Sequence, residues 1–252
     1  MNELHLTRPT DADPERPSIF VALPGYSGVM GGTAMSLFCL GAYLASKGVG
    51  CSGGALNYPD IAECRNVFLS VWYDKYPTST HLLFVDSDMR FAPELVHDMI
   101  AINKPLVGCI YRRKGDVKHW VGKTRPGPQD VENGFLQVEG IGMGVTLIAR
   151  TCIDQMVEKY PELIFDIPVT DPLDLFGPHK LDRVLRFFDK ISFGYAHMSE
   201  DFAFCKRYRD IGGEVYANVA HPIGHIGLKE YGGRLWDDIA ETNVTPYHEA
   251  AE

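Results

Sequence analysis

Residues 81 to 91 read His-Leu-Leu-Phe-Val-Asp-Ser-Asp-Met-Arg-Phe, a short apolar run that stops at two carboxylates, Asp86 and Asp88. An apolar run of this length that ends abruptly at charge predicts a strand buried on both faces of a sheet. Asp86 and Asp88 would then emerge at the carboxyl end of the strand, where open α/β sheets bind ligands. The segment therefore predicts a fold class and the place of a functional site.

The spacing of the two acids indicates a metal site. In extended backbone, residues i and i+2 project to the same side, and the small Ser87 between the acids lets both approach one hard divalent cation. A cation held in this way can bridge a diphosphate. The structural alternative is an Asx-type turn at the strand end, with Asp88 leading towards a helix that Pro93 opens.

Strand and helix patterns alternate along the first 110 residues. This alternation implies an α/β fold with a mostly parallel central sheet flanked by helices, as in Rossmann-like proteins. The expected strands are 18–23, 51–56, 82–85 and 106–110, and the expected helices are 33–47, 61–72 and 93–103.

The pattern changes after Tyr111. A small antiparallel ribbon is expected, and a glycine-rich segment, Gly140 to Gly144, precedes another strand. From Pro161 to Tyr195 the chain is rich in proline, aspartate and phenylalanine and has little periodicity, which predicts an elaborated loop region over 161–196. The remaining expected elements are ribbon strands at 117–121 and 135–138, strands at 145–149 and 214–219, and helices at 152–159 and 199–209.

Bulk properties narrow the class of protein. With 252 residues, of which 45% are hydrophobic, one large domain over 18–230 is expected, with tails at 1–17 and 231–252. No stretch of 18 apolar residues occurs, so a cytoplasmic protein is expected. A net charge of -9 opposes extended nonspecific binding to nucleic acid. The six cysteines form no C-x-x-C pair, and free thiols are expected.

Residues near the ends of the first two strands are candidates for a nucleotide site. The loop Pro24-Gly25-Tyr26 lets backbone approach a ligand, although it lacks the G-x-G-x-x-G spacing and also fits an ordinary strand-to-helix turn. Asn57 follows the second strand, and Arg65 on the next helix can bind a phosphate or a base edge bidentately, or can be a solvated surface arginine. The Arg112-Arg113-Lys114 cluster beyond the fourth strand is open to the same two interpretations.

Two features later in the chain have the chemistry that such a site needs. Glu200 and Asp201 lie in the first turn of a predicted helix, where the helix dipole stabilises acids, but a carboxylate there is also placed to accept a proton from a hydroxyl group. His225 follows a predicted strand and is either a structural histidine or a third metal ligand. Imidazole with carboxylate suits Mn²⁺ better than Ca²⁺.

Four segments, in this order, carry a resemblance to a known family. They are Phe84-Val85-Asp86-Ser87-Asp88, the glycines 140–144 before 145–150, Ser199 to Phe204, and His225-Ile226-Gly227. Together they resemble the nucleotide-sugar-dependent glycosyltransferases of the GT-A fold, family 2-like enzymes of bacterial and phage type. The resemblance spans roughly residues 18 to 230. The long stretch from 161 to 195 has no clear counterpart in that family.

The resemblance implies a role for each candidate residue. Asp86, Ser87 and Asp88 would form the D-x-D site for Mn²⁺ or Mg²⁺ and the diphosphate of a nucleotide-sugar donor, a UDP-sugar by default, with His225 as a further metal ligand. Asp201, or in second place Glu200, would be the acceptor base of an inverting hexosyltransferase-type enzyme. The remaining candidates would line the site: Pro24, Gly25, Tyr26, Asn57 and Arg65 around the nucleotide, and Gly142, Met143 and Gly144 on the sugar or acceptor side.

The acceptor side leaves alternatives open. A set of aromatic residues in the long loop region would form a lid that excludes water, or else a hydrophobic cluster beneath a long loop. The acceptor would be the hydroxyl of a glycan, or of a modified base in phage-type DNA. A sugar nucleotidyltransferase and a non-catalytic nucleotide-sugar or carbohydrate-binding module are the other interpretations, and the sequence leaves the oligomeric state open. The aromatic residues are Phe176, Phe187, Phe188, Phe193 and Tyr195.

Overall fold

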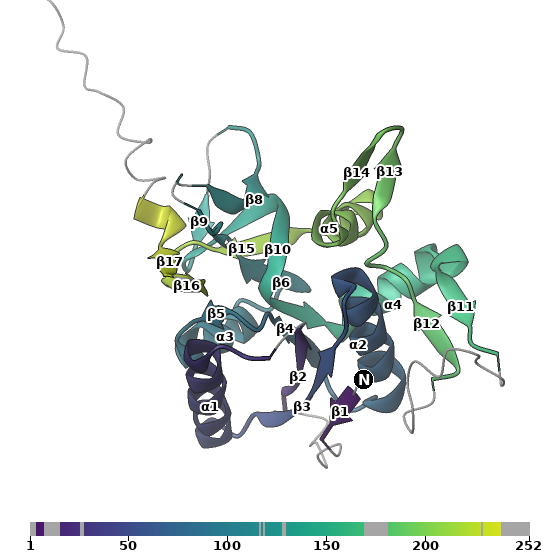
Figure 1. Ribbon diagram of the computed structural model, residues 1–252, viewed down its shortest axis with the longest axis horizontal. Helices are drawn as coiled ribbons and strands as arrows, with labels where there is room; N and C mark the ends of the chain where they lie inside the picture. The colour runs from purple at the N-terminus through teal and green to yellow at the C-terminus, as the bar shows by residue number, and fades with distance from the viewer. Residues whose placement is uncertain are drawn as a thin grey trace, which may run out of the picture.

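A central β-sheet organises the protein, for which a computed structural model describes residues 4–7, 16–25, 28–115, 117, 119–127, 130–168, 181–227 and 229–237. Ten strands of the described chain belong to this sheet (Figure 1). Its main strands follow the order β1 (Leu4–Leu6), β3 (Gly50–Asn57), β2 (Ser18–Gly25), β4 (His81–Val85), β10 (Phe135–Ala149), β15 (Val215–Asn218) and β6 (Leu106–Cys109).

The sheet is mixed but has a largely parallel framework. Strand β2 runs parallel to both β3 and β4, and β15 runs parallel to β6. Strand β10 lies between these two groups and is antiparallel to β4, β6 and β15. The expected α/β chain with a mostly parallel central sheet is therefore confirmed, with one long antiparallel strand at its centre.

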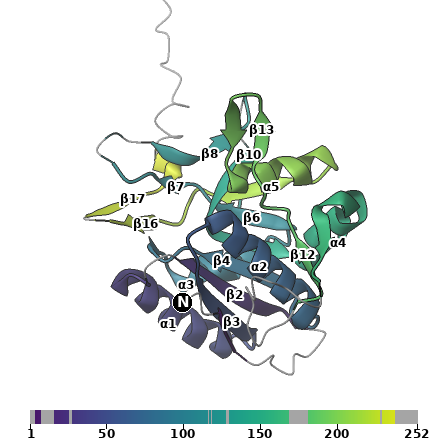
Figure 2. The same ribbon diagram turned by 45° about the vertical axis from the view of Figure 1, so that its right-hand side comes forward.

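Helices cover both faces of the sheet (Figure 2). Helices α1 (Gly31–Ser46) and α3 (Pro93–Ala101) pack on one face, and α2 (Ile61–Lys75), α4 (Arg150–Lys159) and α5 (Glu200–Asp210) pack on the other. The alternation of side chains along β4 divides the core accordingly: Leu82 and Phe84 belong to the α2 side, whereas Leu83 and Val85 belong to the α1 side. All four are fully buried, as the apolar run predicts.

Local capping fixes where α2 begins, and this places one site residue. The Asp60 side chain accepts hydrogen bonds from the backbone N–H groups of Ala62 and Glu63, at 2.9 and 3.2 Å. An N-cap of this kind is typically worth about 1 kcal/mol. Because β3 ends at Asn57, the helix starts at the carboxyl edge of the sheet, and Arg65 lies in its second turn.

The glycine-rich segment before residue 145 belongs to a strand, so the two strands expected at 135–138 and 145–149 are one continuous strand. Strand β10 runs without interruption through 15 residues, with a register shift between Gly142 and Thr146. The glycines give space to neighbouring rings: a Cβ at Gly140 would lie 2.7 Å from Phe202 Cδ1. The expected ribbon is present but differs in extent, since β8 (Trp120–Thr124) and β9 (Val131–Glu132) pair with β10, and β7 (Tyr111–Arg112) pairs with β8.

The region 161–196 contains more structure than an irregular loop. A 3-10 turn η1 (Pro161–Leu163) leads into strand β11 (Ile164–Asp166), which pairs with β12 (Arg183–Leu185). Strands β13 (Ile191–Phe193) and β14 (Ala196–Met198) form a hairpin that projects beside α5 in Figure 1. Strands of three residues are too short to show a periodic pattern in the sequence.

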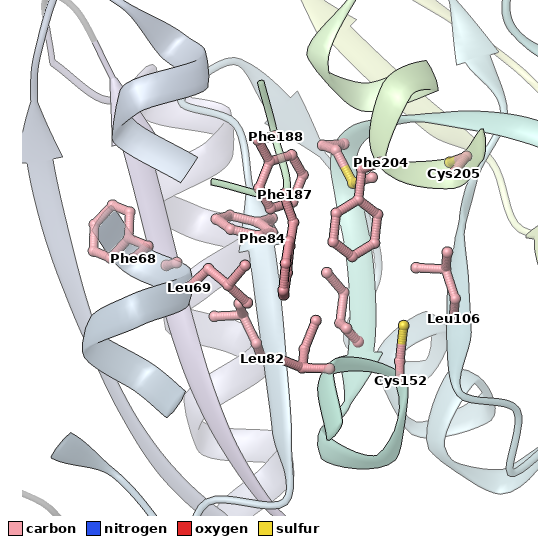
Figure 3. Packing of buried hydrophobic residues seen from close by; sticks show 14 of the residues in the cluster. Phe68, Leu69, Leu82, Phe84, Leu106, Cys152, Phe187, Phe188, Phe204 and Cys205 are labelled. Carbon is pink, nitrogen blue, oxygen red and sulfur yellow. The ribbon is translucent and has the colours of Figure 1, made fainter. Parts of the chain in front are cut away.

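Two of the aromatic residues proposed for a lid are core residues instead. Phe187 and Phe188 are fully buried, and Figure 3 shows Phe188 between Phe84 of β4 and Phe204 of α5. The centroid of the Phe188 ring lies 5.4 Å from that of Phe84 and 4.4 Å from that of Phe204. The hydrophobic-cluster interpretation is therefore correct for this pair, because aromatic rings bury large apolar areas. Phe193 and Tyr195 lie exposed on the hairpin, and Phe176 falls outside the described residues.

A second, three-stranded sheet completes the described fold. It consists of β5 (Met89–Arg90), β16 (Ile223–Ile226) and β17 (Glu230–Gly233). Strand β17 continues the fold beyond residue 230, and β1 falls within the segment expected to be an N-terminal tail. All six cysteines are free thiols, as expected. Of the helices in the described ranges, none has the length and apolar character needed to cross a membrane.

Candidate functional site

The carboxyl ends of β2, β3 and β4 bring three predicted nucleotide-site residues together. Gly25 pairs with Asn57 across β2 and β3, and a Cβ at Gly25 would lie 3.3 Å from Asn57 Oδ1 and 3.8 Å from Ser87 Cβ. Ser87 accepts a hydrogen bond from the Met30 backbone N–H at 2.8 Å. Pro24 directly precedes Gly25 in β2, whereas Tyr26 lies outside the described residues.

Arg65 is a buried site residue and not a surface arginine. Its guanidinium donates to Asp86 through two contacts, Nη1–Oδ1 at 3.0 Å and Nη2–Oδ2 at 3.3 Å. Its Nε lies 3.8 Å from Glu200 Oε1, and its side chain is 4% exposed. The Arg65 guanidinium also lies over the Phe84 ring, 5.6 Å from the centroid. One arginine thus connects α2, the end of β4 and the start of α5.

The charges of this cluster influence one another strongly. Burial by itself would lower the pKa of Arg65, but Asp86 and then Glu200 outweigh it, so the pKa is raised and the group stays cationic. Burial raises the pKa of Glu200, and Arg65 opposes this only in part. Glu200 therefore takes up a proton more readily than an ordinary glutamate.

The two acids of the D-x-D segment point to different partners. The backbone turns directly after β4, where the Met89 N–H donates to the Asp86 carbonyl oxygen at 3.2 Å. Asp86 therefore faces Arg65, whereas Asp88 faces His225 and Lys114. The extended geometry assumed for residues 86–88 is not what the structure has, so it does not bring Asp86 together with Asp88 and His225.

His225 is oriented by its backbone environment. Its Nδ1 lies 2.9 Å from the Arg112 carbonyl oxygen, and its Nε2 lies 3.5 Å from Asp88 Oδ2. A carbonyl only accepts, so Nδ1 carries a proton, and in the neutral ring Nε2 then presents a lone pair towards the carboxylate. A hydrogen bond from Nε2 to Asp88 needs a proton on Nε2 as well, and a metal ion between the two atoms could take the place of that proton.

The donor set of Asp88 and His225 fits a divalent ion with two protein ligands. A carboxylate oxygen and an imidazole nitrogen at this separation are compatible with one Mn²⁺-like ion, whose shell other oxygen ligands would have to complete. Within the described ranges, no three side chains among His, Cys, Asp and Glu converge on one point, so a preformed cage of protein ligands is not seen there. Asp88 is half-buried; burial raises its pKa, but hydrogen bonds with His225 and Lys114 outweigh this and lower it.

The start of α5 places the two candidate bases in different surroundings. Asp201 Oδ1 accepts from the Phe202 backbone N–H at 2.7 Å and from the Ser199 hydroxyl, so its carboxylate is held within the first helical turn. Glu200 instead faces Arg65. Both acids also lie close enough to the cluster to influence its ionisation. The charge of Asp201 raises the pKa of Tyr111 and that of Glu200, and the charge of Glu200 raises the pKa of Arg65.

Tyr111 is a central residue that the sequence interpretation missed. It is buried, and its ring lies edge-on to His225 with a centroid distance of 5.3 Å. A Cβ at Gly142 would lie 2.6 Å from its hydroxyl, and one at Gly144 would lie 2.7 Å from its Cζ. These glycines, which were expected to line the sugar side, make room for Tyr111, and Met143 between them is fully buried in the core. The G-x-G spacing was the available signal, since alternate glycines on one face of a strand indicate a large neighbour.

An apolar cavity of about 460 Å³ lies away from this cluster. It is lined by residues of β1, β2, β3 and α1 and by none of the predicted site residues. The polar groups described above converge instead at the carboxyl edge of the sheet, so the edge is the candidate functional site.

Comparisons with known proteins add only distant likenesses. No protein-family model matches the chain, and no curated protein matches it either. The crystal structure of A197 from STIV is similar with a TM-score of 0.47 and 14% identity, over 84% of this chain and 86% of that one. A crystal structure of a glycosyltransferase involved in the glycosylation of the major capsid of PBCV-1 is similar with a TM-score of 0.34 and 12% identity, over 65% of this chain and 72% of that one. At these values neither likeness carries an argument about what this chain does.

Proposed function

We propose that this chain is a metal-dependent glycosyltransferase that moves a sugar from a nucleoside-diphosphate sugar to an acceptor hydroxyl group with inversion. The observation that carries the proposal is the arrangement of Asp88 and His225, in which a carboxylate oxygen and an oriented imidazole nitrogen lie 3.5 Å apart at the ligand-binding edge of an α/β sheet. A UDP-sugar is the donor that the resemblance implies.

Each part of the site then has a defined task. Gly25, Asn57 and Ser87 would border the nucleoside, and the absence of a Cβ at Gly25 lets the Asn57 and Ser87 side chains lie close beside it. Asp88 and His225 would hold the ion, which would neutralise the charge that develops on the departing diphosphate. Arg65 fixes the direction of the Asp86 carboxylate and keeps that acid from repelling the diphosphate.

The acids at the start of α5 favour transfer over simple binding. A nucleotide-sugar-binding module has no need of a carboxylate on the acceptor side, whereas a transferase needs one to accept the proton of the attacking hydroxyl. Asp201 is the proposed base, since its local hydrogen bonds hold it in one orientation. Glu200 lies against Arg65 and is proposed to orient that guanidinium.

A glycan hydroxyl is the proposed acceptor, and the net charge of -9 is the reason for preferring it to DNA. Nucleic-acid binding depends largely on neutralising phosphates with Lys and Arg. The exposed β13–β14 hairpin adjoins the α5 acids, and its Phe193 and Tyr195 rings are 51% and 101% exposed. Sugar rings stack readily on exposed aromatic side chains, so this hairpin is the proposed acceptor side.

Calorimetry with UDP and Mn²⁺ tests the proposal. The Asp88→Ala variant is expected to lose Mn²⁺-dependent UDP binding, together with release of UDP from a hydrolysable UDP-sugar. Asp98→Ala is a matched control, because Asp98 also pairs with a histidine, His221, at 2.9 Å but lies outside the site. Unchanged Mn²⁺-dependent affinity in Asp88→Ala would contradict the proposal.

A further inference from the structure

We propose that Lys114 is an exchangeable counter-ion of the site: it occupies Asp88 when no metal is bound, and it moves onto the diphosphate when metal and nucleotide enter. The inference rests on the proposed function, since it assigns Asp88 to the metal. The exchange of Lys114 between Asp88 and the diphosphate would add a regulatory step to the proposed function. The site would then resist metal ions that arrive without nucleotide.

The geometry makes Lys114 and a metal ion compete for one atom. Lys114 Nζ lies 2.5 Å from Asp88 Oδ2, and the same oxygen faces His225 Nε2 at 3.5 Å. An ion bound by Asp88 and His225 would need this oxygen as a ligand. Because the ammonium and the ion carry like charges, both cannot stay on Oδ2 without strong repulsion.

The surroundings of Lys114 allow it to move. Its side chain is 39% exposed, whereas that of Arg65, which neutralises Asp86, is 4% exposed and held by two contacts. The base of its loop is anchored, since the Arg113 N–H donates to the His119 carbonyl oxygen at 2.8 Å. A Cβ at Gly227 would lie 3.3 Å from Lys114 Cδ, so the absence of a side chain there leaves room for the lysine stem. A lysine ammonium on a flexible stem can therefore be transferred without moving the backbone.

Charge balance indicates where the Lys114 ammonium goes after a metal ion displaces it from Asp88. Without ligand, Arg65 neutralises Asp86, and Lys114 neutralises Asp88. When a divalent ion takes Asp88, the displaced ammonium is left beside the place where the diphosphate binds, and lysine is a common point-charge ligand of phosphate. Lys114 is then expected to weaken the binding of metal in the absence of nucleotide. Once metal is present, the same lysine is expected to strengthen the binding of nucleotide.

Titrations of wild type and Lys114→Met with Mn²⁺ and with UDP test this double role. Without nucleotide, the variant is expected to bind Mn²⁺ roughly two- to five-fold more tightly, the range that corresponds to the loss of one partly exposed ion pair. At saturating Mn²⁺ the same variant is expected to bind UDP more weakly by a similar factor. Both affinities come from calorimetry, and Mn²⁺ binding can be checked by electron paramagnetic resonance.

A matched control is Lys123→Met, which removes an ion pair of the same length, 2.5 Å to Glu139, from β8. It is expected to leave both affinities unchanged. Opposite shifts of the Mn²⁺ and UDP affinities in Lys114→Met support the proposal, because a purely structural lysine would not produce them. If Mn²⁺ binds to both proteins with equal affinity, the role of Lys114 is wrong but the metal site stands. If even Lys114→Met binds no Mn²⁺, the inference and the proposed function are both wrong.

Discussion

Arg65 and Asp86 form a two-contact ion pair that joins helix α2 to the end of strand β4 inside the candidate site. The guanidinium is almost completely removed from solvent, and its Nε has no hydrogen-bond partner, although Glu200 lies 3.8 Å away. Removing solvent from two charges is costly, and this cost is offset only while both partners remain in place. The pair therefore constrains the site more than it stabilises the fold.

Removal of one partner is expected to be far more costly than removal of both. Arg65→Met leaves Asp86 and Glu200 without their cation, and a loss of about 3 to 5 kcal/mol in the free energy of unfolding is expected. The double variant Arg65→Met/Asp86→Asn is expected to recover part of this loss. Urea unfolding measures both values. Arg183→Met is the control, since Arg183 pairs with Asp74 through similar contacts but is 35% exposed, and a loss of at most about 1 kcal/mol is expected there. Equal losses in the two arginine variants would contradict the interpretation.

Kinetics can separate the roles proposed for the two acids of α5. Asp201→Asn is expected to bind UDP and Mn²⁺ normally but to lower kcat by about 10² to 10⁴, the usual contribution of a general base. Glu200→Gln is expected to keep the base and to alter donor binding through Arg65. Parallel measurement of UDP affinity and of kcat in the two variants provides the test. Full activity of Asp201→Asn, with strongly lowered kcat in Glu200→Gln, would exchange the two assignments.

His81 predicts a specific dependence of stability on pH. Burial at the start of β4 lowers its pKa to about 4 from an ordinary value of 6.5. Between these values the unfolded chain binds a proton that the folded chain does not, so the unfolding free energy falls as the pH falls from 6.5 towards 4. The loss from this group is at most about 2 kcal/mol at pH 5. His81→Gln is expected to flatten this part of the curve in denaturant unfolding between pH 7 and pH 5, and His197→Gln, an exposed histidine, serves as the control.

The contact between Gly144 and Tyr111 predicts a cost of added volume. A Cβ at Gly144 would lie 2.7 Å from Tyr111 Cζ, so Gly144→Ala is expected to destabilise the protein by about 1 to 3 kcal/mol. Adding Tyr111→Ala should make the same glycine substitution nearly neutral, which a double-mutant cycle of unfolding free energies would measure. Gly41→Ala is the control, because nothing lies within 4 Å of a Cβ at that helical position. It is expected to be neutral or slightly stabilising.

The sequence predicts well the parts of the fold that local patterns determine. The apolar run ending at Asp86 identified β4, and the spacing of apolar residues over 61–72 identified α2. The same patterns did not show that the strands expected at 135–138 and 145–149 are one strand, because the glycines between them make room for the distant rings of Tyr111 and Phe202. When a residue's identity is determined by a neighbour distant in sequence, the local sequence pattern gives little indication of its role.

The sequence predicted which candidate residues lie near one another better than it predicted the directions of their side chains. Gly25, Asn57 and Ser87 meet as parallel strands require, and His225 does reach Asp88. The direction of Asp86 was not predictable, because it depends on a backbone turn and on a buried arginine from another helix. Lys114 was visible only as part of a basic cluster, and its contact with Asp88 depends on how the loop after β7 folds back.

Strand β10 connects the two parts of the central sheet mechanically. Its first half pairs with β8, β9 and β15, and its second half pairs with β4 and β6, so one continuous backbone connects the edge that bears Asp86 and Asp88 with the region that bears α5. Within the described chain, two lobes on either side of β10 could therefore separate only if the hydrogen bonds of this strand broke. Heating is therefore expected to melt both regions in a single cooperative step, and substrates are expected to enter through rearranged loops while the strands keep their register.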